Sequence, residues 1–260
     1  MTGRSLHDAL LTVLGDGPLR ARVLTGDTSA SGVLGREEWV VLRRVSRERL
    51  SRMARFLAHH YYRERIVRLF RHVRLLAAHT GRDPLAILDT PAGLASLDQS
   101  VLGTPATAER LVLLIEDSLI ANDAAIRRAI PYWRDLVRYH ATMFRVEAGA
   151  PTSGGSQVGT PRRTPSTRIL ELDWDIPGVI ADLRKGAPPV PIANQAPTCL
   201  LVARARHGRV TVVRCSQDIR VLVEAADGQR SVDQLAGMSG LSVQETGGLL
   251  RELEEMGAIG

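Results

Sequence analysis

The chain has only two cysteines, Cys199 and Cys215, and a single lysine, Lys185. Two cysteines cannot supply the disulfide framework that holds small secreted proteins together, so we expect a cytoplasmic protein. Apolar runs are also short, and none approaches the roughly 18–20 residues that cross a bilayer. Residues 1–17 combine a short apolar stretch with several charges, which argues against a secretory signal. The sequence therefore predicts neither a secreted nor a membrane protein.

Basic charge is carried almost wholly by arginine and is unevenly distributed. The 260 residues, 44% of them hydrophobic, suffice for one or two domains with a real core, and the net charge is +6. Eleven arginines lie between Arg43 and Arg74, against Glu48 and Glu64. A helical surface this basic attracts an acidic partner or nucleic acid, although a solvated helix face has the same composition.

Residues 1–149 have the pattern of helices throughout. Their apolar residues recur every three or four positions, which is the spacing of amphipathic helices. Ser46 can cap the longest segment, in which two offset apolar stripes predict a bend near residues 62–64, or two helices that meet there. Pro131 should kink or split the last helical stretch. An antiparallel bundle buries these stripes economically, and we assign it to residues 1–149.

The composition changes after the helical half. Residues 150–167, APTSGGSQVGTPRRTPST, are dominated by Ser, Thr, Gly and Pro and predict a flexible linker. Residues 168–260 then read as a small antiparallel sheet followed by three helices, a winged-helix-like module. Two of its strands flank His207-Gly208, which we interpret as a two-residue hairpin turn. The predicted fold class is therefore α+β, with an all-helical part before the module.

The final helix, predicted from Ser242 to Met256, carries the wrong charge for DNA recognition. It holds four glutamates and only Arg251, a net of about −3. A helix that enters the major groove needs cations against the phosphates, because neutralising the backbone supplies most of the affinity. The module is better suited to binding an extended peptide. The glutamates are Glu245, Glu252, Glu254 and Glu255.

An edge strand in the module would expose backbone donors and acceptors with which a peptide can pair. Leucines of the final helix can offer pockets for alternate peptide side chains, although they can equally fill the core of the module. We therefore predict peptide-binding residues on both elements. They are Arg209, Val210, Thr211, Val212, Val213, Arg214, Leu249, Leu250 and Leu253.

The hairpin turn also predicts where the cysteines point. A two-residue turn at His207-Gly208 pairs Leu200 with Cys215, so that Cys199 lies on the opposite face of the sheet. This register disfavours a disulfide or a shared metal.

Residue spacing indicates no catalytic or metal site. His60 and Glu64 are four residues apart, as many metal ligands on helices are, but surface salt-bridge pairs share this spacing, and we interpret them so. The sequence has no nucleophile elbow, no phosphate-binding glycine loop and no base with an orienting partner. We therefore predict no catalytic residue, no metal and no cofactor.

Two parts of the sequence resemble proteins of known families. VTVVRCSQDIRVLVEAADGQRSVDQLAGMSGLSVQETGGLLRELEEMGAI, residues 210–259, looks like the peptide-recognition elements of ribosomally made, post-translationally modified peptide pathways. Those elements resemble the small chaperone of pyrroloquinoline quinone biosynthesis. The shared marks are the strand, a helix closed by an Asp-Gly turn, a short serine-led helix and a final L-x-x-L-x-x-x-G-x-I.

Upstream, ALLTVLGDGPLRARVL, SRERLSRMARFLAHHYYRERIVRLF and YWRDLVRYHATMF are similar to partner proteins of multinuclear non-haem iron oxidative enzymes. Methanobactin and 3-thiaglutamate pathways use such partners. The resemblance implies that iron and oxidation chemistry reside in a separate enzyme. This chain would form a heterodimer with that enzyme and bind the precursor peptide as a strand along residues 209–214. The arginine-rich helices are candidates for docking, through Arg55, Arg63, Arg68 and Arg71.

Two other functions remain open from the residues alone. A winged-helix transcriptional regulator with a helical sensor domain fits the basic stretch, but the acidic final helix opposes it. An enzyme in its own right would need a metal or cofactor. We expect a non-catalytic subunit that presents a precursor peptide to an iron-dependent enzyme, with no membrane or nucleic-acid partner.

Overall fold

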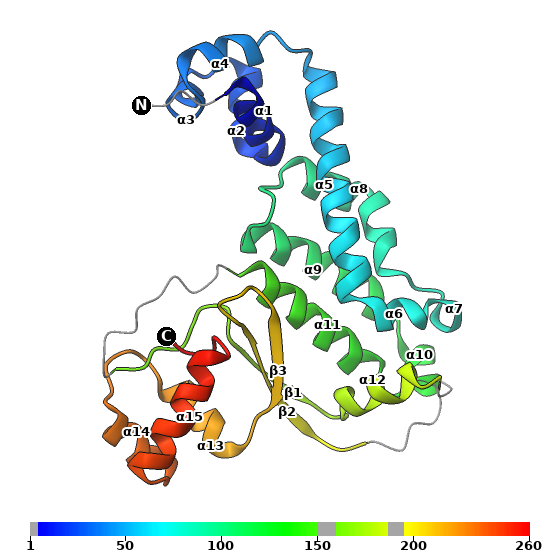
Figure 1. Cartoon of the computed structure of the whole chain (residues 1–260). Helices are drawn as coiled ribbons and strands as arrows, with labels where there is room; N and C mark the ends of the chain where they lie inside the picture. The colour runs from blue at the N-terminus through cyan, green and yellow to red at the C-terminus, as the bar shows by residue number, and fades with distance from the viewer. Residues whose placement is uncertain (1–4, 150–159, 187–194) are drawn as a thin grey trace.

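Helices dominate the structure, and a single antiparallel sheet of three strands lies near the carboxyl end. The computed structural model describes residues 5–149, 160–186 and 195–260. Figure 1 shows an elongated arrangement in which an amino-terminal helical group, a middle helical layer and the sheet with its helices follow one another. The predicted α+β class is confirmed.

The amino-terminal helices form a small core of their own. Their apolar side chains, among them Val13, Leu34 and Trp39, pack around Leu50 and Ala54 at the start of the long helix that follows. Aspartate or serine caps open several of these helices, as Asp16 does by accepting a hydrogen bond from the Leu19 N–H at 2.8 Å. The elements are α1 (Leu6–Gly15), α2 (Gly17–Thr25), η1 (Thr28–Ala30), α3 (Ser31–Leu34) and α4 (Arg36–Leu42).

The long helix α5 (Arg47–Leu69) is continuous through residues 62–64, so the alternative that two helices meet there is wrong. Its buried residues lie four positions apart, from Leu50 to Ile66, and a single stripe therefore serves two cores. The chain changes direction at Phe70 instead, where α6 (Arg71–Leu75) and α7 (Ala77–Thr80) begin a new path. The second apolar stripe in the sequence belongs mainly to these short helices.

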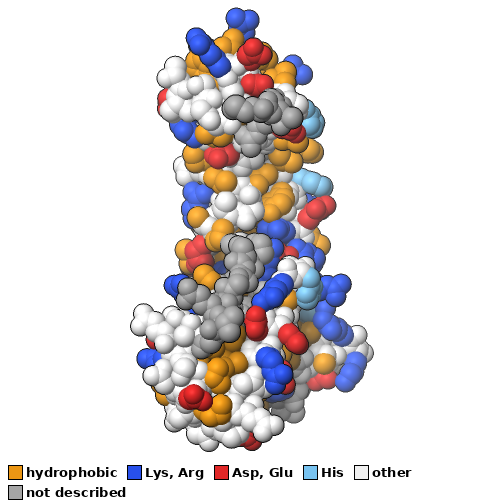
Figure 2. All heavy atoms as spheres, turned by 60° about the vertical axis from the view of Figure 1, so that its left-hand side comes forward, with side chains coloured by type: hydrophobic (Ala, Val, Ile, Leu, Met, Phe, Trp, Pro, Cys, Tyr) orange, Lys and Arg blue, Asp and Glu red, His pale blue; other side chains and the backbone are white. Residues whose placement is uncertain are grey.

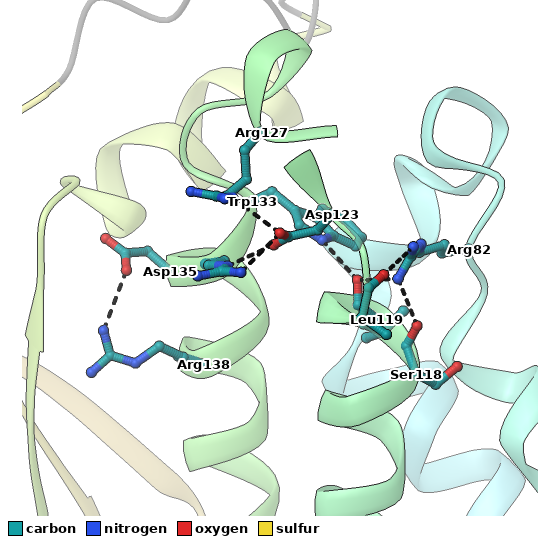
Figure 3. A network of polar contacts seen from close by, with 10 residues as sticks. Arg82, Ser118, Leu119, Asp123, Arg127, Trp133, Asp135 and Arg138 are labelled. Atoms are coloured by element: carbon teal, nitrogen blue, oxygen red, sulfur yellow. Dashed lines mark hydrogen bonds and ion pairs between the residues drawn. The ribbon is translucent and has the colours of Figure 1, made fainter. Parts of the chain in front are cut away.

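The middle layer ends in two helices separated at Pro131, as the sequence predicts. Arg82 and Trp133 satisfy carbonyl groups at the end of α9, with hydrogen bonds of 2.9 and 3.1 Å to the Leu119 oxygen (Figure 3). Asp123 accepts hydrogen bonds from two arginines beside this end. The elements are η2 (Pro84–Asp89), α8 (Pro91–Asp98), α9 (Pro105–Ile120), α10 (Ala124–Ala129) and α11 (Trp133–Ala148).

The sheet lies between α11 on one face and the carboxyl-terminal helices on the other (Figure 1). Leu170 and Leu200 join the core of the helical layer, whereas Leu201 and Ala203 face the last three helices. The helical half predicted as residues 1–149 thus shares its last helix with the sheet. The elements are β1 (Arg168–Leu172), α12 (Ile176–Arg184), β2 (Thr198–Arg204), β3 (Val210–Arg214), α13 (Gln217–Ala225), α14 (Val232–Ser239) and α15 (Val243–Glu255).

Residues 160–167 belong to the carboxyl-terminal module rather than to a linker. The Arg163 N–H donates to the Ala226 carbonyl at 2.7 Å, and the Thr164 N–H to the Ala258 carbonyl at 3.0 Å. Thr164 and Thr167 are buried. The predicted linker of residues 150–167 is therefore too long at its carboxyl end, because backbone pairing overrides the flexible composition; residues 150–159 lie outside the described residues.

Asp135 fastens α11 to the end of β1. It is buried, and one of its carboxylate oxygens accepts the Asp173 and Trp174 N–H groups at 2.6 and 3.0 Å. Arg138 lies 3.4 Å from the other oxygen (Figure 3). Burial raises the pKa of this carboxyl group, and the two N–H donors partly oppose the rise.

Replacing Asp135 by alanine should lower the free energy of unfolding by about 2 kcal/mol, because two donors lose a charged acceptor. Urea unfolding followed by circular dichroism measures this difference. Asp117→Ala, at an exposed position of α9, is the matched control and should change stability by less than about 0.5 kcal/mol. Equal effects of the two substitutions would contradict the role given to Asp135.

In the part of the chain that the structure describes, no helix is both long enough and apolar enough to span a bilayer.

Candidate functional site

Strand β3 has a hydrogen-bonded neighbour on one side only. The sheet order is β1-β2-β3, and no described strand pairs with the outer side of β3. The Cys215 N–H donates to the Cys199 carbonyl at 2.9 Å, so the backbone of Cys215 faces β2. Because backbone direction alternates in an antiparallel pair, the N–H and C=O groups of Val210, Val212 and Arg214 face outward.

The hairpin before β3 is one residue longer than predicted. The Gly208 N–H donates to the Ala205 carbonyl, and the Ala205 N–H to the Arg209 carbonyl, both at 2.8 Å. Gly208 has a φ of +87°, the left-handed conformation that closes a three-residue loop. Leu200 therefore pairs with Arg214, and the predicted Leu200–Cys215 pairing is wrong.

This shift by one residue places Cys199 opposite Cys215. The prediction that they lie on opposite faces is wrong, because a one-residue change of register moves every side chain of a strand to the other face. Both thiols are free and half-buried. Burial is the main cause that raises the pKa of the Cys215 thiol to about 12, and the neighbouring Cys199 thiol is the next largest cause. The Cys215 thiol is therefore protonated at neutral pH.

A groove of about 440 Å³ lies between β3 and α15. Its apolar wall combines Val213 of the strand with Ile219 of α13 and Leu249 of α15, and glutamates line its rim. Thr211 and Val213 thus face the groove, whereas Val212 packs against the core on the α11 side. The lining residues are Ala205, His207, Thr211, Val213, Arg214, Ile219, Leu249, Glu252, Leu253, Glu255 and Met256.

Helix α15 is fixed at its start by a capping box. Ser242 Oγ accepts the Glu245 N–H at 3.2 Å, and the Glu245 carboxylate accepts the Ser242 N–H at 3.0 Å. The hydroxyl and amide hydrogen bonds from Ser242 lower the pKa of Glu245. Glu252 and Glu255 remain on the groove side of the helix. The helix wall of the groove is therefore acidic and does not suit a phosphate backbone.

The leucines predicted to bind peptide differ in where they lie. Leu249 is partly buried and lines the groove. Leu253 also touches the groove but is largely buried in the core. Leu250 is buried and lines a different pocket, which lies between α15 and residues 160–161. A helix places adjacent residues about 100° apart, and Leu249 and Leu250 accordingly line different pockets.

The apolar groove residues that the sequence pattern did not indicate are Ala205 of the hairpin and two residues of the helical segments, Ile219 and Met256. Both sit at positions whose helical spacing is equally typical of core residues. The signal that could have found Ile219 is its place three residues after Ser216, which caps α13 directly after β3.

The four arginines predicted to dock an enzyme are not equivalent. Arg55 forms a bidentate ion pair with the Asp98 carboxylate, with N···O distances of 3.0 and 2.7 Å, and Arg68 forms an ion pair with Glu147. Arg63 and Arg71 are exposed, and no described residue forms an ion pair with either. Figure 2 shows basic side chains along the whole length of the face it draws, so arginine is not gathered into one patch there.

Searching the described residues reveals no group of three or more side chains that could hold a metal ion. His60 and Glu64 lie 3.4 Å apart as an exposed pair on α5. No protein-family model matches the chain, and no curated protein is similar to it in sequence.

Proposed function

We propose that the chain is a non-catalytic subunit that binds a ribosomally made precursor peptide and presents it to a separate iron-dependent oxidative enzyme. The observation that carries this proposal is the open edge of β3 beside an apolar groove. An extended peptide can add to such an edge as a fourth strand, because its backbone meets the outward N–H and C=O groups of Val210, Val212 and Arg214. In this proposal the oxidation chemistry belongs to the separate enzyme.

Side chains of the added strand alternate between the two faces of the sheet. Those on the α15 side enter the groove against Val213, Ile219 and Leu249. Main-chain pairing supplies affinity for any extended peptide, and the groove adds selectivity for apolar side chains. The acidic rim at Glu252 and Glu255 favours peptides over nucleic acid.

The helical part is proposed to dock the enzyme. The resemblance to partner proteins of iron-dependent oxidative enzymes supports this role, as does the exposed surface of α5. Phe56 on that helix is 75% exposed, and Arg63 is also exposed. Holding the peptide beside the enzyme raises its effective concentration without new chemistry. The proposed setting is the cytoplasm, where both thiols stay reduced.

Hydrogen exchange of the complex tests where the peptide binds. The probes are fluorescein-labelled peptides from the short reading frames beside the gene, titrated with the full chain by fluorescence anisotropy. For the peptide that binds, we expect exchange of the Val210, Val212 and Arg214 amides to slow by at least about tenfold, because they gain acceptors. Amides of β1, at the other edge of the sheet, are the internal control.

Protection of β1 alone, or of neither edge, would overturn the proposed binding mode. Failure of every such peptide to bind, with and without the neighbouring enzyme, would refute the function itself.

A further inference from the structure

A second cavity, of about 370 Å³, opens on the α11 side of the sheet, where α5, α6 and α12 approach the hairpin. Four arginines line it, against a single carboxylate, Glu147. Arg68 pairs with Glu147 and balances its charge. Three guanidinium groups remain, and no described side chain forms an ion pair with them. They belong to Arg71, Arg184 and Arg209.

Two buried histidines form the inner wall of this cavity. His72 and His140 are each only 3% exposed, and their rings stack with centroids 5.4 Å apart. The Nδ1 atom of His72 and both ring nitrogens of His140 lack a hydrogen bond of ordinary geometry. A buried polar atom without a partner costs about 1–3 kcal/mol. The wall therefore offers unused hydrogen-bonding capacity beside unpaired cations.

The cavity adjoins the start of the open edge. Arg209 and Val210 line it, and Val210 is the first residue of β3 whose backbone faces outward. In an added strand, the residue paired with Val210 projects its side chain to the same face of the sheet as Val210 does. Because neighbouring strands lie about 4.8 Å apart, that side chain reaches the mouth of the cavity.

We propose that this cavity binds the carboxylate of an aspartate or glutamate in the peptide that pairs with β3. The assignment rests on the proposed function, because it is the added strand that carries the side chain there. Arg71, Arg184 and Arg209 neutralise the carboxylate, and the neutral imidazole of His72 donates an N–H to it. The substrate is therefore an extended peptide with an acidic residue at the hairpin end and apolar side chains on the groove face.

A double-mutant cycle tests the pairing between peptide and cavity. The probe is the peptide that binds the full chain, together with versions in which each Asp or Glu is replaced singly by Asn or Gln. We expect one replacement to weaken binding to the native chain by about tenfold or more, and to have little effect on binding to Arg71→Gln/Arg184→Gln. The matched control is Arg49→Gln/Arg52→Gln, which removes the same charge from α5 outside the cavity.

Each outcome decides the proposal. Unchanged affinity of Arg71→Gln/Arg184→Gln for the native peptide overturns it while leaving strand addition at β3 intact. An equal loss in the Arg49→Gln/Arg52→Gln control also overturns it, since the effect is then one of net charge. Inorganic phosphate is a further probe. If phosphate binds the native chain, fails to bind Arg71→Gln/Arg184→Gln, and does not compete with the peptide, the cavity is a site for free anions and the proposal is overturned. Thermal unfolding of both variants confirms that they are folded.

Discussion

Replacing Val212 by proline should weaken peptide binding by about 100-fold or more, which is about 2.7 kcal/mol. The N–H of Val212 faces away from β2, so the sheet itself loses no hydrogen bond. An added strand, by contrast, loses the central donor of the edge and meets the proline ring where its own backbone must lie. Fluorescence anisotropy with the labelled peptide measures the change in affinity.

Val212→Thr is the matched control, because threonine keeps the N–H and the branched shape of valine. We expect its affinity to stay within about threefold of that of the native chain. Thermal unfolding of the proline variant shows whether the sheet has survived. A folded proline variant that binds the peptide as tightly as the native chain would exclude strand addition at this edge.

Local signals in the sequence located the elements of this site but not its fine geometry. Ser242 and Glu245 predicted the start of the acidic helix, and the structure has the same capping box. The hairpin was also predicted, yet its register was not. His207-Gly208 fits both a two-residue and a three-residue loop, and only the pairing of Ala205 with Arg209 in the structure distinguishes them. One residue of error in the register then placed Cys199 and Cys215 on opposite faces, whereas in the structure they pair across the two strands on the same face.

Long-range packing accounts for the other differences. Helix α11 was expected to belong to a helical bundle, because its apolar stripe does not tell which surface it covers. In the structure it contacts both α9 and β2. The cavity at His72 and His140 was likewise missed. These residues are far apart in sequence and meet only because α6 and α11 pack together, so neither histidine had a recognisable partner in the linear pattern.

The same two histidines should make the protein sensitive to mild acid. Burial is the main cause that lowers the pKa of His72 to about 4 and that of His140 to about 3, with Arg71 a further cause for both. Arg184 also faces His72, and the Leu69 carbonyl opposes the shift of His140 slightly. In the unfolded chain both imidazoles take up a proton near pH 6.5.

Folded-state pKa values below the unfolded value mean that the unfolded chain binds more protons between about pH 6.5 and 4. Stability is therefore complete above pH 6.5 and is lost as the pH falls. Between pH 7 and pH 5 each histidine should cost about 2 kcal/mol, about 4 kcal/mol together. Urea unfolding at a series of pH values measures this loss, in a range above that where most carboxylates titrate.

Substitution by residues that do not titrate separates this effect from general acid destabilisation. His140→Phe should roughly halve the loss between pH 7 and pH 5, because a phenyl ring takes up no proton and can keep the tilted contact with Phe70 and the edge contact with Tyr139 that the imidazole makes. His60→Gln, at an exposed position, should leave the pH dependence unchanged. If His140→Phe loses as much stability as the native chain over this range, burial does not keep the imidazole of His140 neutral in the folded protein.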